Sequence, residues 1–228
     1  MSSHDTVDPY VMPEVAMLPP DRTGWALDPR RAALLVLNVQ NHFLRVLRES
    51  SVPVDGLVAG IGRLAATARA AGVPVLYAVS TAEREHAGHG AAFGHPRFPR
   101  DDDSGDVVPD LRPRVGDTVL AAKRFSAFAG TRLRHRLAEL DRDQPVIVGV
   151  FARTQVMLTA ADALMQDMEP FVVADAVADR TDTDRRMALD WIAATCGAVR
   201  ALGGMVDALD ALDARSGEEY GAEPGRPV

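Results

Sequence analysis

Residues 145–179 read PVIVGVFARTQVMLTAADALMQDMEPFVVADAVAD. The β-branched run 145–151 predicts a buried strand, the span 154–166 predicts a helix, and 170–176 predicts a second strand. A strand, a helix and a strand in this order form a βαβ unit, whose two strands lie parallel in one sheet.

The same alternation extends in both directions along the chain. Further apolar runs predict strands at 32–37, 73–79, 117–122 and 198–202. Helical spacing marks the segments 56–71, 131–140, 183–196 and 205–212, and Thr183 is the expected N-cap of the third. The irregular segment 80–116 is expected to be a surface excursion with one short helix. The pattern therefore predicts an α/β fold, in which helices cover both faces of a parallel sheet.

The chain is expected to form one domain at 31–213, because 228 residues suit a single core. An irregular, proline-rich arm (1–30) precedes it, and Trp25 and Leu27 are expected to pin this arm to the body. Beyond it, residues 214–228 are polar and rich in glycine and proline, which predicts a disordered tail.

Composition excludes several classes of function. The net charge is −7, without a basic stripe, which argues against nucleic acid as a partner. No apolar stretch approaches the roughly 20 residues that span a bilayer, so no membrane partner is expected. The N-terminus lacks the features of a signal peptide, and the single cysteine, Cys196, excludes an intramolecular disulfide. We therefore expect a cytoplasmic protein.

In open parallel sheets, ligands bind outside the carboxyl ends of the strands, near the point where the strand order reverses. The candidate site residues are therefore sought just past each predicted strand. These positions fall at 38–42, 80–84, 123–128, 151–155 and 175–179.

Several of these strand ends carry a family resemblance. WALDPRRAALLVLNVQNHFL (25–44), AAKRFSAFAGTRL (121–133), RRMALDWIAATCGAV (185–199) and the opening segment together resemble the isochorismatase family, over roughly residues 25–205. They are most similar to the branch that serves phenazine and catechol siderophore biosynthesis. The resemblance implies a three-layer α/β/α fold with a six-stranded parallel sheet, a homodimer or higher homo-oligomer, and no metal or cofactor. It also implies a cis peptide at Val150–Phe151.

The family's usual catalytic groups, an Asp, a Lys and a Cys, are all replaced here. The Asp position is Asn38, the Lys position falls on Ala122 with Lys123 one residue later, and the Cys position is Gln155. An amide cannot serve as a general acid near neutral pH, and glutamine is no nucleophile. A shift of one residue on a strand turns a side chain to the opposite face, so Lys123 is not assumed to replace the missing lysine.

The polar residues that remain at the strand ends could bind a carboxylate. Arg124 matches the family's arginine, and Arg153 and Thr154 open the helix after the fourth strand, where N–H groups and the helix dipole favour an anion. The catalytic candidates are Asn38, Lys123, His42 and Gln155. The substrate-binding candidates are Ser80, Arg124, Phe125, Phe151, Arg153 and Thr154; relatives often have Tyr at the two Phe positions.

Each candidate also has a plainer interpretation. Asn38 either orients a substrate or bonds local backbone, and Arg124 either clamps a carboxylate or forms a structural ion pair. Lys123 and His42 are either reactive groups or surface side chains. The spacing of His86, His89 and His95 permits a metal site, but ordinary loop histidines are favoured, and Cys196 is expected to be a buried structural thiol.

Two main functions remain open. In the first, the scaffold is repurposed as an enzyme of secondary metabolism that acts on a small, carboxylate-bearing, chorismate-derived or other natural-product substrate. In the second, the chain is a catalytically inactive binding or oligomerisation protein. Ordinary isochorismatase activity is a third possibility, which the missing triad disfavours.

Overall fold

Six parallel strands form the central sheet of the computed structural model, which describes residue 10 and residues 17–81 and 103–219. The sheet order is β3-β2-β1-β4-β5-β6, and every ladder is parallel. The strands are β1 (Ala32–Leu37), β2 (Val75–Ser80), β3 (Thr118–Ala122), β4 (Gln144–Val150), β5 (Phe171–Ala178) and β6 (Ala198–Arg200). The predicted six-stranded α/β fold is confirmed.

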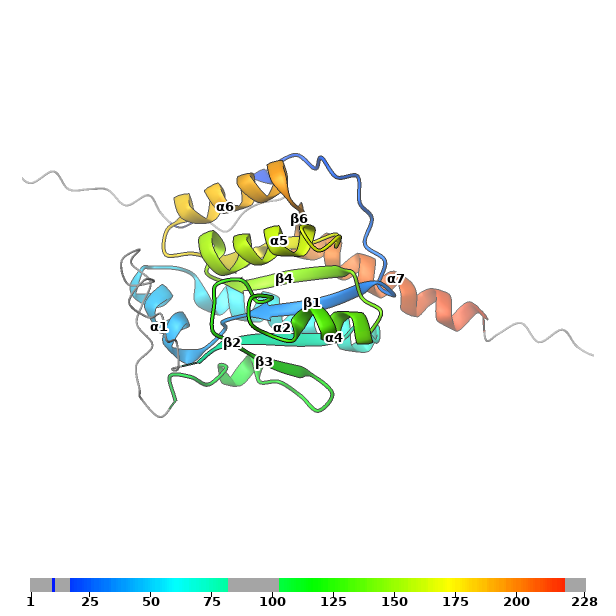
Figure 1. Ribbon diagram of the computed structural model, residues 1–228, viewed down its shortest axis with the longest axis horizontal. Helices are drawn as coiled ribbons and strands as arrows, with labels where there is room; N and C mark the ends of the chain where they lie inside the picture. Colours follow the sequence, from blue (N-terminus) through cyan, green and yellow to red (C-terminus); the bar gives the residue numbers. More distant parts are fainter. Residues whose placement is uncertain (1–9, 11–16, 82–102, 220–228) are drawn as a thin grey trace, which may run out of the picture.

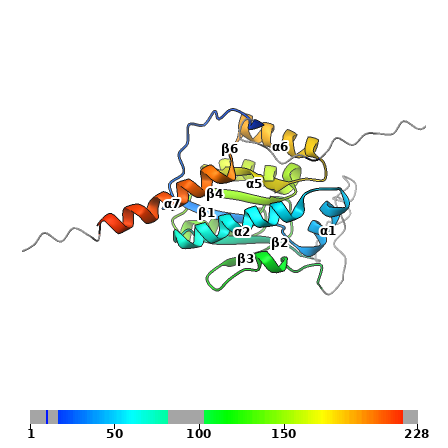
Figure 2. The ribbon, with the colours of Figure 1, turned by 180° about the vertical axis from the view of Figure 1, so that it is seen from behind.

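Helices cover both faces of this sheet (Figures 1 and 2). One layer holds α1 (Asn41–Glu49), α2 (Val54–Ala70) and α7 (Leu202–Glu219), and the other holds α4 (Leu133–Glu139), α5 (Met157–Leu164) and α6 (Asp182–Thr195). Two short elements, the 3₁₀ helix η2 (Pro109–Leu111) and the π-helix η3 (Ala152–Val156), complete the described part. The layers are α, β and α, as expected.

The strands are apolar throughout because both of their faces are buried. All six residues of β1 are buried, and they alternate between two cores. Leu34 and Val36 pack in the cluster under α1, α2 and α7, whereas Leu35 and Leu37 pack in the cluster under α4, α5 and α6. This burial on both sides explains why β1 is a continuous apolar run and not an alternating one.

Several boundaries differ from the sequence-based expectations. Helix α1 was not predicted, although Phe43, Leu44 and Leu47 give it one buried face. Helix α6 starts at Asp182, and its N-cap is Thr181 instead of Thr183, because the Thr181 side chain accepts a hydrogen bond from the Asp184 N–H. The short helix expected within 80–116 is η2.

The predicted tail also differs from the structure at its start. Helix α7 continues to Glu219, beyond the domain end predicted at residue 213, so the first residues of the expected disordered tail are helical. Residues 220–228 lie outside the described part of the chain.

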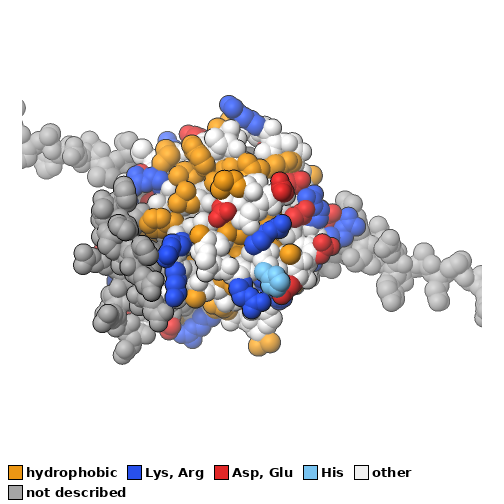
Figure 3. All heavy atoms as spheres, in the orientation of Figure 1, with side chains coloured by type: hydrophobic (Ala, Val, Ile, Leu, Met, Phe, Trp, Pro, Cys, Tyr) orange, Lys and Arg blue, Asp and Glu red, His pale blue; other side chains and the backbone are white. Residues whose placement is uncertain are grey.

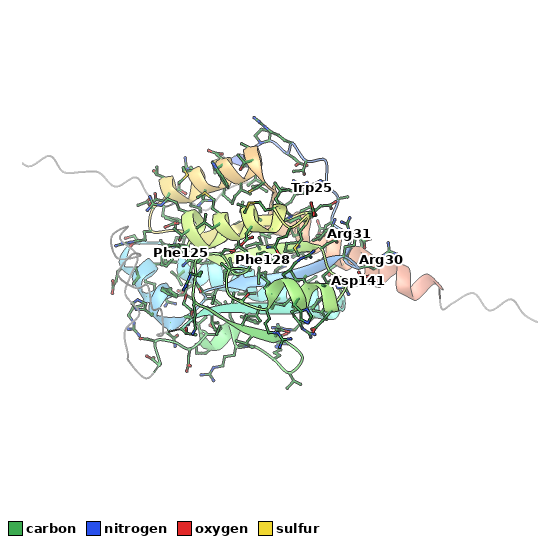
Figure 4. The ribbon with its side chains drawn as sticks, viewed as in Figure 1. Trp25, Arg30, Arg31, Phe125, Phe128 and Asp141 are labelled. Carbon is green, nitrogen blue, oxygen red and sulfur yellow. The ribbon has the colours of Figure 1, made fainter. Side chains whose placement is uncertain are left out.

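The arm is tied to the body at the amino edge of the sheet, as predicted. Trp25 and Leu27 pack against the core, and the Trp25 ring lies 6.3 Å from that of Phe171. The Gln144 side chain accepts a hydrogen bond from the Asp28 N–H and donates one to the Ala26 carbonyl. Figure 4 shows Trp25 at this end of the sheet, opposite the end where α1 lies.

The central strands β1 and β4 approach each other closely at Gly149, which is the register partner of Leu37. Gly149 has φ +111°, and a Cβ there would lie 2.1 Å from the Leu37 carbonyl oxygen. Glycine is required because no side chain fits against this backbone and because L-residues rarely adopt this φ.

Replacing this glycine tests the close approach. We expect Gly149→Ala to lower the free energy of unfolding by about 3 kcal/mol, because β1 and β4 must separate. Gly203→Ala, in α7 with open space around its Cβ position, is the matched control and should leave stability unchanged or slightly raised. Denaturant unfolding measures both, and equal stability of the two variants would contradict this account.

Candidate functional site

The candidate site lies at the carboxyl edge of the sheet, between β1 and β4. The chain proceeds outward from β1 to β3 on one side and from β4 to β6 on the other, so the order reverses at this pair. Asn38 directly follows β1 and Phe151 directly follows β4. This reversal is the position at which α/β sheets bind ligands.

Asn38 presents a buried amide at this point. It is 3% exposed, with φ +52°, a backbone region that asparagine adopts more readily than most residues. Its Oδ1 atom accepts a hydrogen bond from Ser80 Oγ at 3.1 Å, and its N–H donates to the Ala78 carbonyl. The Asn38 amide is therefore oriented by β2 and can donate to or accept from a ligand, but it supplies no acidic proton.

Gln40 is a site residue that the sequence analysis missed. It is fully buried, and its Nε2 atom donates to the carbonyl oxygens of Ser80 and Gly105, while its Oε1 atom accepts from the Ser80 N–H at 2.8 Å. This side chain joins the end of β1 to the end of β2 and to the segment beyond residue 103. No local pattern signals it, because its partners lie 40 and 65 residues away.

Ala122 and Lys123, at the end of β3, lie in different environments. Ala122 is the register partner of Ser80 and is buried in the core below α4 and α5. The next residues, Lys123 and Arg124, are exposed, and Arg124 Nη1 donates to the Lys123 carbonyl at 3.2 Å. A methyl group thus stands where the family resemblance implies an amine, and Lys123 has a different environment.

The segment RFSAF (124–128), which follows β3, is hydrogen-bonded to α5. Ser126 Oγ donates to Asp162 at 2.6 Å, and the Ala127 N–H donates to the buried Thr159 hydroxyl at 3.0 Å. Phe128 is buried in the core, whereas Phe125 is half-buried and lies toward the carboxyl end of the sheet (Figure 4). These bonds fix the loop that presents Lys123 and Arg124.

The Val150–Phe151 peptide, in the turn after β4, is cis, as the family resemblance implies. It leads into η3, where Gln155 is 3% exposed. Gln155 Oε1 accepts hydrogen bonds from the Phe151 N–H at 3.2 Å and from Thr154 Oγ at 2.5 Å. The side chain at the Cys position therefore folds back onto its own turn, and Thr154 is engaged with it.

His42 and Phe151 belong to one packed group. The His42 ring lies 5.3 Å from that of Phe43, and the Phe43 ring meets Phe151 edge-on at 5.7 Å. His42 is half-buried, whereas Phe151 is buried in the core under α1 and α2. This stacking brings the candidates that follow β1 and β4 together.

Arg153 was expected to bind a substrate carboxylate, but its hydrogen bonds are to two aspartates of the protein. Its guanidinium donates to Asp184 on α6 at 2.7 Å, and its backbone N–H donates to the Asp179 carboxylate, also at 2.7 Å. An internal carboxylate thus already accepts from an N–H in the first turn of η3, and the Arg153 side chain is turned to α6. The predicted clamp of Arg124 and Arg153 on one ligand is not formed by these contacts.

Two aspartates at the end of β5, in the segment DAVAD (175–179), have structural partners. Asp175 accepts from the Leu202 N–H at the start of α7, and Asp179 accepts from the N–H groups of Arg153 and Arg180. Burial raises the pKa of the Asp179 carboxyl, and the two N–H groups partly offset this. The segment therefore fixes α7 and η3 to the end of β5.

Other predictions fall outside this site. Cys196 is a buried free thiol, as expected. His86, His89 and His95 lie outside the described residues. Within the described ranges, no group of three or more His, Cys, Asp or Glu side chains could hold a metal ion. None of the helices there is both long and apolar enough to cross a bilayer.

Comparisons with known proteins converge on one family. The family model described as "Isochorismatase domain" matches residues 32–202. The phenazine biosynthesis protein PhzD1 of Pseudomonas aeruginosa is 36% identical over 201 residues, which cover 87% of this chain and 96% of that protein. Enterobactin synthase component B of Escherichia coli is 34% identical over 192 residues, which cover 83% of this chain and 67% of that protein.

Solved structures share the fold. An isochorismatase family protein from Desulfovibrio vulgaris superposes with a TM-score of 0.67 at 27% identity, covering 79% of this chain and 99% of that one. A cysteine hydrolase from Pseudomonas syringae gives a TM-score of 0.72 at 21% identity, covering 82% and 96%. At that identity the second match concerns the fold alone.

The Gln40 bridge generates a test. Gln40→Leu removes two donors and one acceptor that bond the backbone of buried Ser80 and of Gly105, and we expect it to lower the free energy of unfolding by about 2–4 kcal/mol. Gln166→Leu, whose amide bonds Asp162 four residues away on a half-buried surface, should cost less than about 1 kcal/mol. Chemical denaturation compares the two, and a Gln40 variant as stable as the control would show that the bridge is dispensable.

Proposed function

The chain belongs to the isochorismatase family, and we propose that within it the scaffold is repurposed to act on a small carboxylate-bearing substrate. One observation carries the proposal. At the carboxyl edge of β1, the position where the resemblance implies an acid holds the neutral, buried Asn38 amide, oriented by Ser80. Such a site can bind and orient a ligand, but it cannot protonate a vinyl ether through residue 38.

The substrate carboxylate is assigned to Arg124, whose guanidinium can make charge-assisted, bidentate hydrogen bonds. Asn38 and Ser80 would orient the polar groups of the ring, and the half-buried Phe125 would contact its face. Arg153 is left out, because its guanidinium is engaged with Asp184. Positioning and desolvation then supply much of the rate, with His42 or Lys123 as the group that moves a proton.

A second candidate function is a catalytically inactive protein that binds a ligand or an oligomeric partner. It is favoured by the internal satisfaction of Gln155, whose carbonyl oxygen accepts from Phe151 and Thr154, and by the burial of Phe151 on Phe43. The side chains of Phe151, Thr154 and Gln155, which follow β4, therefore contact other residues of the chain. Binding of a carboxylate is common to both candidates, whereas turnover separates them.

The biological setting is proposed from the relatives. Two of them are named for phenazine biosynthesis and for enterobactin synthesis, so a role in natural-product biosynthesis suits this chain. We also assign it to the cytoplasm, as a homodimer or higher homo-oligomer that needs no metal or cofactor.

Because residue 38 is Asn and not an acid, isochorismatase activity can be tested directly. We expect no useful release of pyruvate from isochorismate or its amino analogue, measured with a coupled lactate dehydrogenase assay. Asn38→Asp alone should restore little, because Ala122 still lacks the amine, and Asn38→Asp combined with Ala122→Lys should restore more. Asn41→Asp, three residues away, is the control.

Two outcomes would contradict this prediction. Turnover by the unmodified chain at the rate of an intact family member would require another proton donor. A gain of several hundredfold from Asn38→Asp alone, equivalent to about 3.5 kcal/mol of barrier, would mean that the rest of the site is intact.

Carboxylate binding is tested separately from turnover. Benzoate and cyclohexadiene carboxylates should raise the melting temperature, because a ligand at about 100 times its Kd stabilises the fold by about 2.7 kcal/mol. Arg124→Ala should abolish the shift, Asn38→Ala should reduce it, and Arg134→Ala, exposed on α4, should leave it unchanged. If no carboxylate in the panel shifts the transition, or if Arg124→Ala has no effect, the assignment of the carboxylate to Arg124 is wrong.

A further inference from the structure

We propose that a groove between α1, α2 and η2 binds a small monoamine, whose ammonium group bonds Asp110 and whose apolar body lies on α2. The groove is on the face of the sheet seen in Figure 2, away from α4, α5 and α6, whose outer surface Figure 3 shows. It shares no residue with the carboxylate contacts assigned above. The inference therefore does not rest on the proposed function.

The groove has the size of a small-molecule site. Its volume is about 530 Å³, within the range of roughly 300–1,000 Å³ that is usual for ligand pockets. Its apolar lining comes from Val58, Ala59 and Gly62 of α2, and from Val108 and Pro109 where η2 begins. A ring or a short alkyl chain would bury its apolar surface against these residues.

Gly62 keeps the lining of α2 open. Glycine destabilises the interior of a helix relative to alanine, so its presence there needs a reason. Packing explains Gly60, where a Cβ would lie 3.3 Å from the Leu202 side chain on α7. At Gly62 a Cβ would lie 3.5 Å from the Leu111 side chain, which is an ordinary contact distance, so the fold admits a side chain at this position. Because Gly62 lines the groove, its missing side chain leaves volume for a ligand.

The wall that faces α2 is tied to the sheet. The Val108 N–H donates a hydrogen bond to the Val39 carbonyl at 3.1 Å, and Val107 pairs with Gln40 in an antiparallel bridge. Leu111, at the end of η2, is buried in the core under α1 and α2. The groove is therefore formed before a ligand binds, which reduces the entropy that binding costs.

The polar lining favours a cation. Arg48 and Asp55 neutralise each other in an ion pair at 3.0 Å, whereas the exposed Asp110 forms no ion pair with the residues that the structure describes. Asn41 also lines the groove, and its Nδ2 atom donates to the Asp103 carbonyl, which leaves its Oδ1 atom as an acceptor. An ammonium group has three donors and no acceptor, so it matches a carboxylate together with an amide oxygen.

Titration of the full chain with tryptamine, followed in ¹⁵N–¹H spectra of the backbone amides, tests the proposal. Tryptamine joins an ammonium group to an indole ring. We expect saturable shifts of the Ala59, Gly62 and Asp110 N–H signals with a dissociation constant of about 1 mM or lower, which is usual for a ligand of this size. Indole-3-acetate has the same ring and the opposite charge, and it should leave these signals unchanged.

Two variants test the assigned contacts. Asp110→Asn should raise the tryptamine dissociation constant about tenfold or more, because it removes a charge-assisted hydrogen bond. Gly62→Leu should abolish the saturable shifts, because leucine fills the groove. The matched controls are Asp106→Asn, the same charge change on an exposed residue outside the lining, and Gly56→Leu, on α2 with open space around its Cβ position. Both controls, and Arg124→Ala, should bind tryptamine as the unmodified chain does.

Several results would overturn the proposal. One is the absence of saturable shifts of the groove signals with tryptamine up to about 10 mM. Equal binding of indole-3-acetate is another, because it would mean that the exposed Arg63 and Arg112, which do not line the groove, outweigh Asp110. Unchanged affinity of Asp110→Asn, or of a Gly62→Leu variant that keeps the unmodified far-UV circular dichroism spectrum, also contradicts it. Loss of binding in Arg124→Ala would place the amine at the carboxylate site instead.

Discussion

The contact between Gly149 and the backbone of Leu37 is the constraint on which the site depends. A Cβ at residue 149 would overlap the Leu37 carbonyl, so the two central strands can approach this closely only with glycine there. Asn38 follows Leu37, and the cis peptide Val150–Phe151 follows Gly149. The separation of β1 and β4 therefore sets the distance between the residues that follow them, at the point where the sheet order reverses.

The side chains around this point are neutral, and the polar ones among them are held by hydrogen bonds. Asn38 and Ser80 bond each other, Gln155 bonds its own turn, and a methyl group stands at residue 122. Buried amides held by such bonds provide direction and selectivity, because a ligand that cannot match them leaves buried polar atoms unpaired. The family fold is thus retained, and we propose that the chemistry at this edge of the sheet differs from that of the relatives.

The fold was predictable from the sequence because its strands are buried on both faces. The runs 32–37 and 145–151 contain almost no polar residue, and that composition is itself the signal of a parallel sheet. Helix α1 is not predicted because it begins with asparagine and histidine, only three residues after β1, although the spacing of Phe43, Leu44 and Leu47 indicates a helix.

The site was only partly predictable because its geometry depends on contacts between distant residues. The positions of Asn38 and Gln155 at strand ends followed from the sequence. The bonds from Gln40 to Ser80 and from Arg153 to Asp184 join residues 40 and 31 positions apart, and no local pattern encodes them. The sequence therefore predicts that Arg153 binds a carboxylate ligand, whereas in the structure its guanidinium donates to Asp184 on α6.

We propose that the Asn38 amide and Arg124 face a common carboxylate ligand. The most direct test of this proposal is the ¹⁵N–¹H spectrum of the side-chain amides and guanidinium groups during titration with a cyclohexadiene carboxylate. The account predicts saturable shifts of the Asn38 NH₂ and Arg124 Nε–H signals with one dissociation constant, while the Gln144 NH₂ signal, at the opposite edge of the sheet, stays fixed. Unchanged Asn38 and Arg124 signals at saturating ligand, or shifts that fit two unrelated dissociation constants, would contradict it.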